Sequence, residues 1–164
     1  MESIIAWIAA TPMSAAITNP DNYWIIPAVQ TVHILAICVV MSSVLLLNLR
    51  LVGLIGGGEP KDVFTRRYLP WVWTALVVLL LSGAILIIGE PNRDLDDWVF
   101  WVKMCLVLTA IILTLILEQP VLRNAQYWES GARRPLSRFL ALAAISCWVC
   151  IALCGRWIAY TYGG

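Results

Sequence analysis

The sequence predicts an all-α integral membrane protein: a four-helix bundle with up-down-up-down topology, preceded by a short interfacial helix. Three observations support this prediction. Of the 164 residues, 61% are hydrophobic and 13% are charged, whereas a soluble domain has about 45–50% apolar and about 25% charged residues. Four apolar runs are each long enough to cross a hydrocarbon core of about 30 Å as a helix. Most of the cations gather in two of the three connections between these runs.

The predicted spans are apolar runs separated by segments that contain glycine and proline. In lipid, every backbone N–H and C=O group needs an internal partner, so each run is expected to be helical. Pro70 is expected in the first turn of the second span, where a missing N–H is tolerated. The breaking segments are residues 56–60, 89–92, 119–120 and 131–135. The predicted spans are residues 24–49, 68–88, 98–117 and 139–160 of a single transmembrane domain, 1–164.

Residues 1–20 do not have the pattern of a cleavable signal peptide. A basic n-region is missing, and the apolar stretch 4–10 is short and followed by Thr11-Pro12. The apolar residues Ile4, Ile5, Trp7 and Ile8 instead predict a short helix that lies in the outer membrane interface.

The distribution of cations predicts the orientation. Eight lie in or beside the first and third connections: Arg50, Lys61, Arg66, Arg67, Arg123, Arg133, Arg134 and Arg138. Three lie toward the other side: Arg93, Lys103 and Arg156. The positive-inside rule therefore places both termini on the periplasmic side of a bacterial inner membrane. An outer aromatic belt agrees with this orientation, and consists of Tyr23, Trp24, Trp98, Trp101, Trp157, Tyr160 and Tyr162.

Composition and motifs exclude several functional classes. The net charge of +1 gives no field to attract nucleic acid. A single histidine excludes a His-Glu-x-x-His zinc motif, and Gly56-Gly57-Gly58 lacks the ending of a phosphate-binding loop. The five cysteines all lie in the predicted spans and give no disulfide framework. The chain is therefore not expected to act as an enzyme on its own.

Polar residues in the spans are the main indication of function, because they are costly in lipid and tend to face protein. In the first span, Gln30, His33, Met41 and Asn48 fall within about 60° of one another on a helix. In the third span, Lys103, Ala110, Thr114 and Glu118 share a face. The fourth span offers a row of small residues for helix contact: Ala143, Ser146, Cys147, Cys150 and Cys154. Glu118 is expected to pair with Arg123 or Arg50.

Depth brings several of these side chains to one level. His33 lies nine residues past Trp24, or roughly 13 Å inward at 1.5 Å per residue. The other residues expected in the outer third of the bilayer are Ser82, Gly83, Lys103, Met104, Cys154 and Arg156. We take this level as the candidate site.

His33 is a candidate axial ligand for haem b, whose iron takes a neutral imidazole. Lys103 and Arg156 would then neutralise the haem propionates through charge-assisted hydrogen bonds. Gly83 would let the macrocycle approach a backbone. The cofactor-binding prediction is therefore His33, Gly83, Lys103, Met104 and Arg156, with His33 as the metal ligand.

Other ligands remain open. One histidine supplies one axial ligand, so the iron would be five-coordinate, bind Met41 or Met104, or use His33 from a second copy. Copper competes with haem because Cys and Met suit Cu(I); the sulfur-bearing candidates are Met104, Cys105, Cys147, Cys150 and Cys154. A quinone is a further alternative, and the last alternative is a protein that binds no cofactor.

Structural interpretations compete with each of these roles. His33 could serve as a hydrogen-bonding group that joins two helices, with Ser82 or a backbone carbonyl as its partner. Lys103 and Arg156 could extend to the interface as long cationic side chains do near helix ends.

Several short motifs resemble a family of small, uncharacterised bacterial inner-membrane proteins. They are Val32-His33-Ile34, Asn48-Leu49-Arg50-Leu51-Val52-Gly53, Leu69-Pro70-Trp71, Ser82-Gly83 and Phe100-Trp101-Val102-Lys103. The family pattern has Leu-His, Asp-Leu-Arg-Leu-Leu-Gly, Pro-Trp, Thr-Gly and Phe-x-x-Lys in this order, over about residues 24–120. Asn48 stands where Asp is usual, which removes an acid that could pair with Arg50, and Ser82 stands where Thr is usual.

The resemblance implies a four-helix membrane protein of unassigned function. It places His33, Arg50, Pro70, Gly83 and Lys103 at motif positions, and it extends distantly to membrane domains of the copper-resistance D type. From the residues of the candidate site, and not from the resemblance, we expect a small redox-associated membrane subunit that passes electrons to or from a partner. The alternative is a non-catalytic structural or assembly subunit. Its expected partners are the lipid bilayer and either further copies or a larger membrane complex, without nucleic acid.

Overall fold

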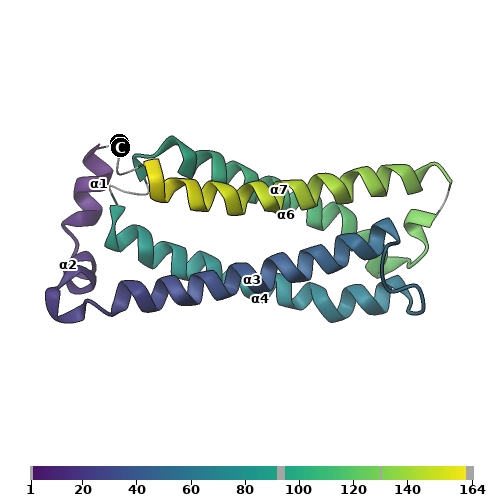
Figure 1. The fold of residues 1–164 in the computed structure, drawn as a ribbon, viewed down its shortest axis with the longest axis horizontal. Coiled ribbons are helices and arrows are strands. Elements are labelled where there is room, and N and C mark those ends of the chain that lie inside the picture. The colour runs from purple at the N-terminus through teal and green to yellow at the C-terminus, as the bar shows by residue number, and fades with distance from the viewer. Residues whose placement is uncertain (1, 92–94, 130, 162–164) are drawn as a thin grey trace.

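Four long helices account for most of the chain and confirm the predicted all-α membrane bundle. The computed structural model describes residues 2–91, 95–129 and 131–161 (Figure 1). The long helices are α3 (Ile25–Val52), α4 (Lys61–Gly89), α6 (Trp98–Arg123) and α7 (Arg133–Thr161). Each is long and apolar enough to cross a membrane.

The helices pack as two antiparallel pairs. α3 contacts α4 and α6 contacts α7, while α3 with α7 and α4 with α6 join the pairs. Figure 1 shows the connection 53–60 and residues 124–129 after α6 together at one end, hereafter the loop end. The start of α3 and the end of α7 lie at the other, hereafter the termini end.

The N-terminal segment forms two short helices and not the single helix predicted. These are α1 (Glu2–Ala9) and α2 (Pro12–Thr18), followed by the 3₁₀ turn η1 (Pro20–Asn22). Thr11 separates them because its Oγ1 accepts the Ser14 N–H at 3.3 Å as an N-cap, and Pro12 occupies the first helical position. Both helices contact α4 at the termini end.

Helices α4 and α6 extend several residues beyond the predicted spans, and a proline lies inside each of them. α4 begins at Lys61, so Pro70 is in its interior and not in the first turn. α6 continues to Arg123 through Pro120, so residues 119–120 do not break it. A proline removes one intrahelical hydrogen bond. The added turns of α4 bury Phe64 and Thr65, and this burial favours helix over loop.

The connection after α3 is fixed by local bonds. Gly53 has φ = 91°, and the Leu54 N–H reaches Leu49 O at 3.0 Å, which is a Schellman ending that favours glycine. The Arg50 guanidinium donates to Ile55 O and Glu59 O and so holds the loop against the helix.

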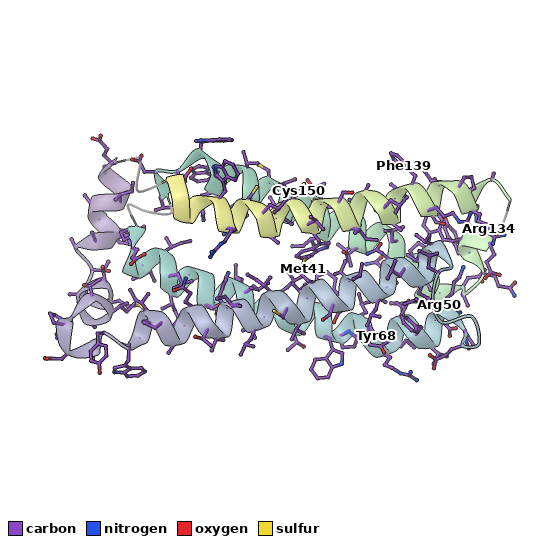
Figure 2. The ribbon with its side chains drawn as sticks, viewed as in Figure 1. Met41, Arg50, Tyr68, Arg134, Phe139 and Cys150 are labelled. Carbon is purple, nitrogen blue, oxygen red and sulfur yellow. The ribbon has the colours of Figure 1, made fainter. Side chains whose placement is uncertain are left out.

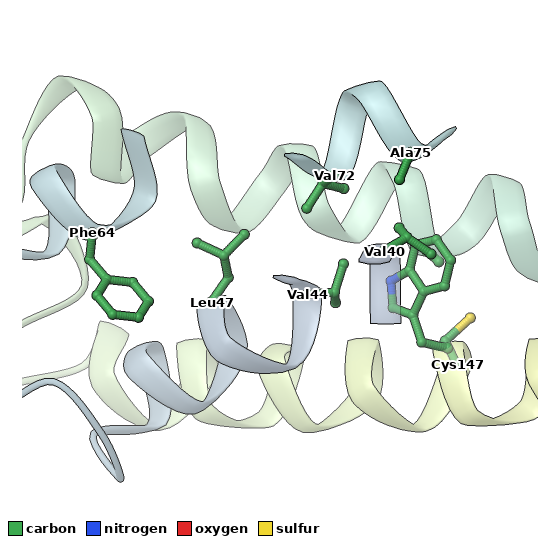
Figure 3. Packing of buried hydrophobic residues seen from close by; sticks show 9 residues of the cluster. Val40, Val44, Leu47, Phe64, Val72, Ala75 and Cys147 are labelled. Carbon is green, nitrogen blue, oxygen red and sulfur yellow. The ribbon is translucent and has the colours of Figure 1, made fainter. Parts of the chain in front are cut away.

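The buried core lies toward the loop end. Figure 3 shows Val40, Val44 and Leu47 of α3 alongside Phe64, Val72 and Ala75 of α4, with Cys147 of α7 nearby. A second cluster consists of Leu51, Leu117, Val121, Trp128, Ala141 and Ala144. By contrast, residues 101–109 of α6 and 149–157 of α7 contain no buried residue. In Figure 1 the two helix pairs stand apart at this level, so the termini half is the less tightly packed part of the bundle.

Gly89 marks a close approach that we predict will not accept a larger residue. A Cβ placed there would lie 3.1 Å from Ile26 Cδ1 and 3.2 Å from Ile17 Cγ2. We expect Gly89→Val to lower the free energy of unfolding by about 1–3 kcal/mol through overpacking. The measurement is denaturant unfolding of the detergent-solubilised protein. Gly155→Val is the matched control, because a Cβ at Gly155 meets nothing within 4 Å; an equal loss in both variants would contradict the prediction.

Candidate functional site

His33 is half-buried on α3 and is joined to α4 by one hydrogen bond. Its Nδ1 lies 2.7 Å from Ser82 Oγ, and Ser82 is buried. The sequence offered this bond as the structural interpretation of His33, and the structure confirms the contact. Since α3 and α4 belong to the same antiparallel pair, the bond ties that pair together in its termini half.

Ser82 fixes which nitrogen of His33 carries the proton. The Ser82 hydroxyl donates to Val78 O at 2.6 Å, a bond back to its own helix of the kind common for serine. A hydroxyl has one proton, so Oγ acts as the acceptor toward His33 and Nδ1 carries the hydrogen. In the neutral ring this leaves a lone pair on Nε2. The hydrogen bonds among the described residues include none at Nε2, so this nitrogen can accept a proton donor or bind a metal.

Gly83 provides space beside the imidazole. A Cβ built on Gly83 would contact only His33 Cε1, at 3.5 Å. Any larger residue would therefore occupy the side of the ring that faces this backbone. That Gly83 would let a haem macrocycle approach a backbone stays a prediction, since this geometry shows only the contact between Gly83 and the imidazole.

Lys103 reaches the same region from α6. It is half-buried, its Nζ lies 5.6 Å from the centroid of the Phe100 ring, and it is close enough to His33 to act on it electrostatically. Phe100 lies one turn nearer the termini end, so the Lys103 side chain extends in that direction. Lys103 thus lies within electrostatic range of His33 from the second helix pair, while Gly83 lies directly beside the imidazole.

The remaining predicted ligands lie farther out. Met104 and Arg156 are exposed, at the surfaces of α6 and α7. Met41 is eight residues from His33 on the same helix, about 12 Å along the axis, and packs against the core cluster around Val40. That separation is too large for Met41 and His33 to bind one iron. The nearest described elements of the site are therefore the imidazole, the glycine and the lysine.

The cysteines do not converge. Cys147 is buried and its Sγ donates to Leu106 O at 3.2 Å, whereas Cys105 and Cys150 are exposed. Cys154 packs beside Val99 and Phe100. Within residues 2–91, 95–129 and 131–161, no three His, Cys, Asp or Glu side chains are grouped so that they could hold a metal ion.

Glu118 does not pair with Arg123 or Arg50, as the sequence suggested. It is buried and accepts a hydrogen bond from Thr65 Oγ1 at 2.9 Å. Arg50 is occupied by its own loop, and Arg123 is exposed. Thr65 was missed because it lies before the predicted second span. Its position seven residues before Val72, on the same helical face, was the available signal.

Two predicted faces need correction. Gln30 is exposed although it falls in the polar sector of α3, because the helix pairs diverge at that level. On α7, Ser146 and Cys150 are exposed, and the buried residues are Ser137, Ala141, Ala144, Cys147 and Trp148. The small residues of α7 do line a contact, but on a face rotated from the predicted row. On α6, the predicted stripe of Ala110, Thr114 and Glu118 is buried as expected.

A comparison with family models gives one result. The model of a family of unknown function, DUF6644, matches residues 13–161. The chain belongs to this family. The match includes all four long helices and every motif that carried the resemblance noted above. Neither the curated proteins nor the solved structures contain a match.

The bond between His33 and Ser82 predicts a measurable coupling. In a double-mutant cycle of His33→Ala and Ser82→Ala, we expect a coupling in the free energy of unfolding of about 0.6 kcal/mol, with about 1.7 kcal/mol as the upper range for such bonds in membranes. Unfolding in mixed micelles supplies the measurement. The control cycle pairs His33 with Thr74, an exposed residue whose hydroxyl bonds Pro70 O, and should give no coupling. A His33–Ser82 coupling as small as the control would show that the bond does not stabilise the fold.

Proposed function

We propose that this DUF6644 protein is a small redox-associated membrane subunit that binds haem b through His33 Nε2 and passes electrons to or from a partner. The observation that carries the proposal is the Ser82–His33 bond, because it leaves Nε2 as the unprotonated nitrogen in a half-buried position. Histidines that bind metals almost always donate their other ring N–H in this way.

The residues around His33 fit the group. Gly83 leaves the side of the imidazole open, and Lys103 brings a cation that suits a propionate. Bound haem would supply one-electron chemistry. The chain itself would hold the imidazole in one tautomer through Ser82 and would limit water through the buried pair Val99 and Phe100. Electron transfer would need a partner that supplies or accepts the electron.

Two alternatives share the same residues. The first is a structural or assembly subunit in which His33 only joins α3 to α4, and the observed bond favours it directly. The second is a quinone, whose reduced form could donate a hydroxyl proton to Nε2 and whose oxidised form could accept from Lys103. Copper is less well supported, because Cys147 Sγ donates to Leu106 O while Cys105 and Cys150, which could supply the soft ligands that copper prefers, are exposed.

We further propose a bacterial inner membrane as the location, with the loop end in the cytoplasm and both termini in the periplasm. The cations of the loop end support this orientation through the positive-inside rule. The bacterial origin rests on the motif resemblance, as does the distant similarity to copper-resistance D-type domains. The protein is expected to work as a homo-oligomer or within a larger complex.

The visible spectrum of the purified protein tests the cofactor. We expect a Soret band in protein expressed with sufficient haem supply, and its loss in His33→Ala because the iron loses its ligand. Thr31→Ala is the control, since Thr31 is exposed on the same helix and bonds only Pro27 O. A preparation that stays colourless after haem is added would overturn the haem proposal and leave the structural alternative.

A reporter fusion tests the orientation. A periplasm-dependent reporter fused after Gly164 should be active, and the same reporter inserted near Gly57 should be silent, because that loop lies beside the cations. The opposite pattern would reverse the proposed topology.

A further inference from the structure

The loop end carries a surface of exposed arginines. Its members come from α4, α6 and the first turns of α7: Arg66, Arg123, Arg133, Arg134 and Arg138. Figure 2 shows Arg134 at this end, with Arg50 nearby on α3. We refer to these five exposed residues as the arginine surface.

The acidic side chains of the loop end are accounted for by interactions with groups outside the arginine surface. Glu59 pairs with Arg67 at 2.7 Å and Glu129 with Lys61 at 3.3 Å. Glu118 is buried against Thr65, and Asp62 lies in the first turn of α4, where the helix dipole favours an acid. Among the described residues, therefore, no ion pair neutralises the arginine surface.

Several contacts hold these arginines in place. Arg66 Nη2 donates to Leu122 O at 3.1 Å, which sets it against the end of α6 beside Arg123. The Arg133 guanidinium lies 4.4 Å from the centroid of the Tyr127 ring. That turn is anchored by buried Trp128, whose N–H donates to Leu117 O at 3.0 Å. Arg134 and Arg138 lie one turn apart on α7 and so share a face.

Apolar side chains continue directly from this surface toward the membrane centre. Phe139 is 68% exposed and Leu142 is 55% exposed, and both follow Arg138 within about one turn of α7. Figure 2 shows Phe139 pointing away from the other helices. The surface thus presents guanidinium groups next to an apolar strip, and this combination matches an amphiphile with an anionic head.

We propose that the arginine surface binds the headgroups of anionic phospholipids, with their acyl chains along Phe139 and Leu142. Guanidinium groups bind phosphate oxygens through paired charge-assisted hydrogen bonds. The apolar strip distinguishes a lipid from a free phosphate or a nucleic acid, neither of which has a chain to place there. The site lies at the opposite end from His33 and requires no redox cofactor.

The test measures lipid retention by the full-length protein with native mass spectrometry, using phosphatidylglycerol and phosphatidylcholine of equal chain length. We expect preferential retention of phosphatidylglycerol. Each arginine at a membrane surface contributes about a fivefold change in affinity, so Arg134→Gln/Arg138→Gln should weaken it well over tenfold. Arg67→Gln is the matched control, because Glu59 already neutralises Arg67.

Three outcomes would overturn the proposal: equal retention of the two lipids, an equal loss in the Arg67→Gln control, or displacement of the lipid by inorganic phosphate at similar concentrations. The last would assign the surface to free phosphate. If the double variant does not fold, Arg123→Gln serves in its place, with an expected loss of about fivefold relative to Arg67→Gln because only one arginine is removed.

Discussion

In the hydrocarbon core, a polar side chain must form its hydrogen bond either within its own helix or with a neighbouring helix, and this constraint organises the bundle. Most hydroxyls bond a carbonyl of their own helix, as Thr31, Thr74 and Thr109 do. A smaller group bonds across helices, and each such bond marks a place where two helices are held in register. His33 with Ser82 and Thr65 with Glu118 are side-chain pairs of this kind.

The two pairs sit in different surroundings. The Thr65–Glu118 pair is enclosed by the apolar clusters of the loop half, where α4 meets α6. The His33–Ser82 pair lies within one helix pair, in the half where α6 and α7 bury few residues. A buried carboxyl with a single neighbouring hydroxyl is suited to stability of a closed core. The half-buried imidazole of His33 has no hydrogen bond at Nε2 among the described residues, so it is suited to binding a further group.

Sequence patterns predicted the four spans, their order and the His33–Ser82 contact, because the length of an apolar run and the cost of a polar side chain in lipid follow directly from the chemistry of the bilayer. They predicted less well which side of each helix faces its neighbours. Lipid is as apolar as the protein interior, so leucines and valines face both, and Gln30 and Ser146 show that a polar or small residue alone does not identify the contact. The partner of Glu118 was missed for a different reason. Thr65 enters the core only because α4 begins seven residues before the predicted span.

The short connection between α3 and α4 affects the order of biogenesis. During synthesis the chain emerges from its N-terminus, so these two helices are complete before α6 has been made. The eight-residue connection between α3 and α4 is held against α3 by hydrogen bonds from Arg50, which allows the two helices to enter the bilayer as a hairpin. His33 of α3 and Ser82 of α4 can therefore form their hydrogen bond at that stage, before α6 and α7 are present. Glu118 of α6 bonds Thr65 of α4, which belongs to the first hairpin, so this bond forms only after the two hairpins have packed together.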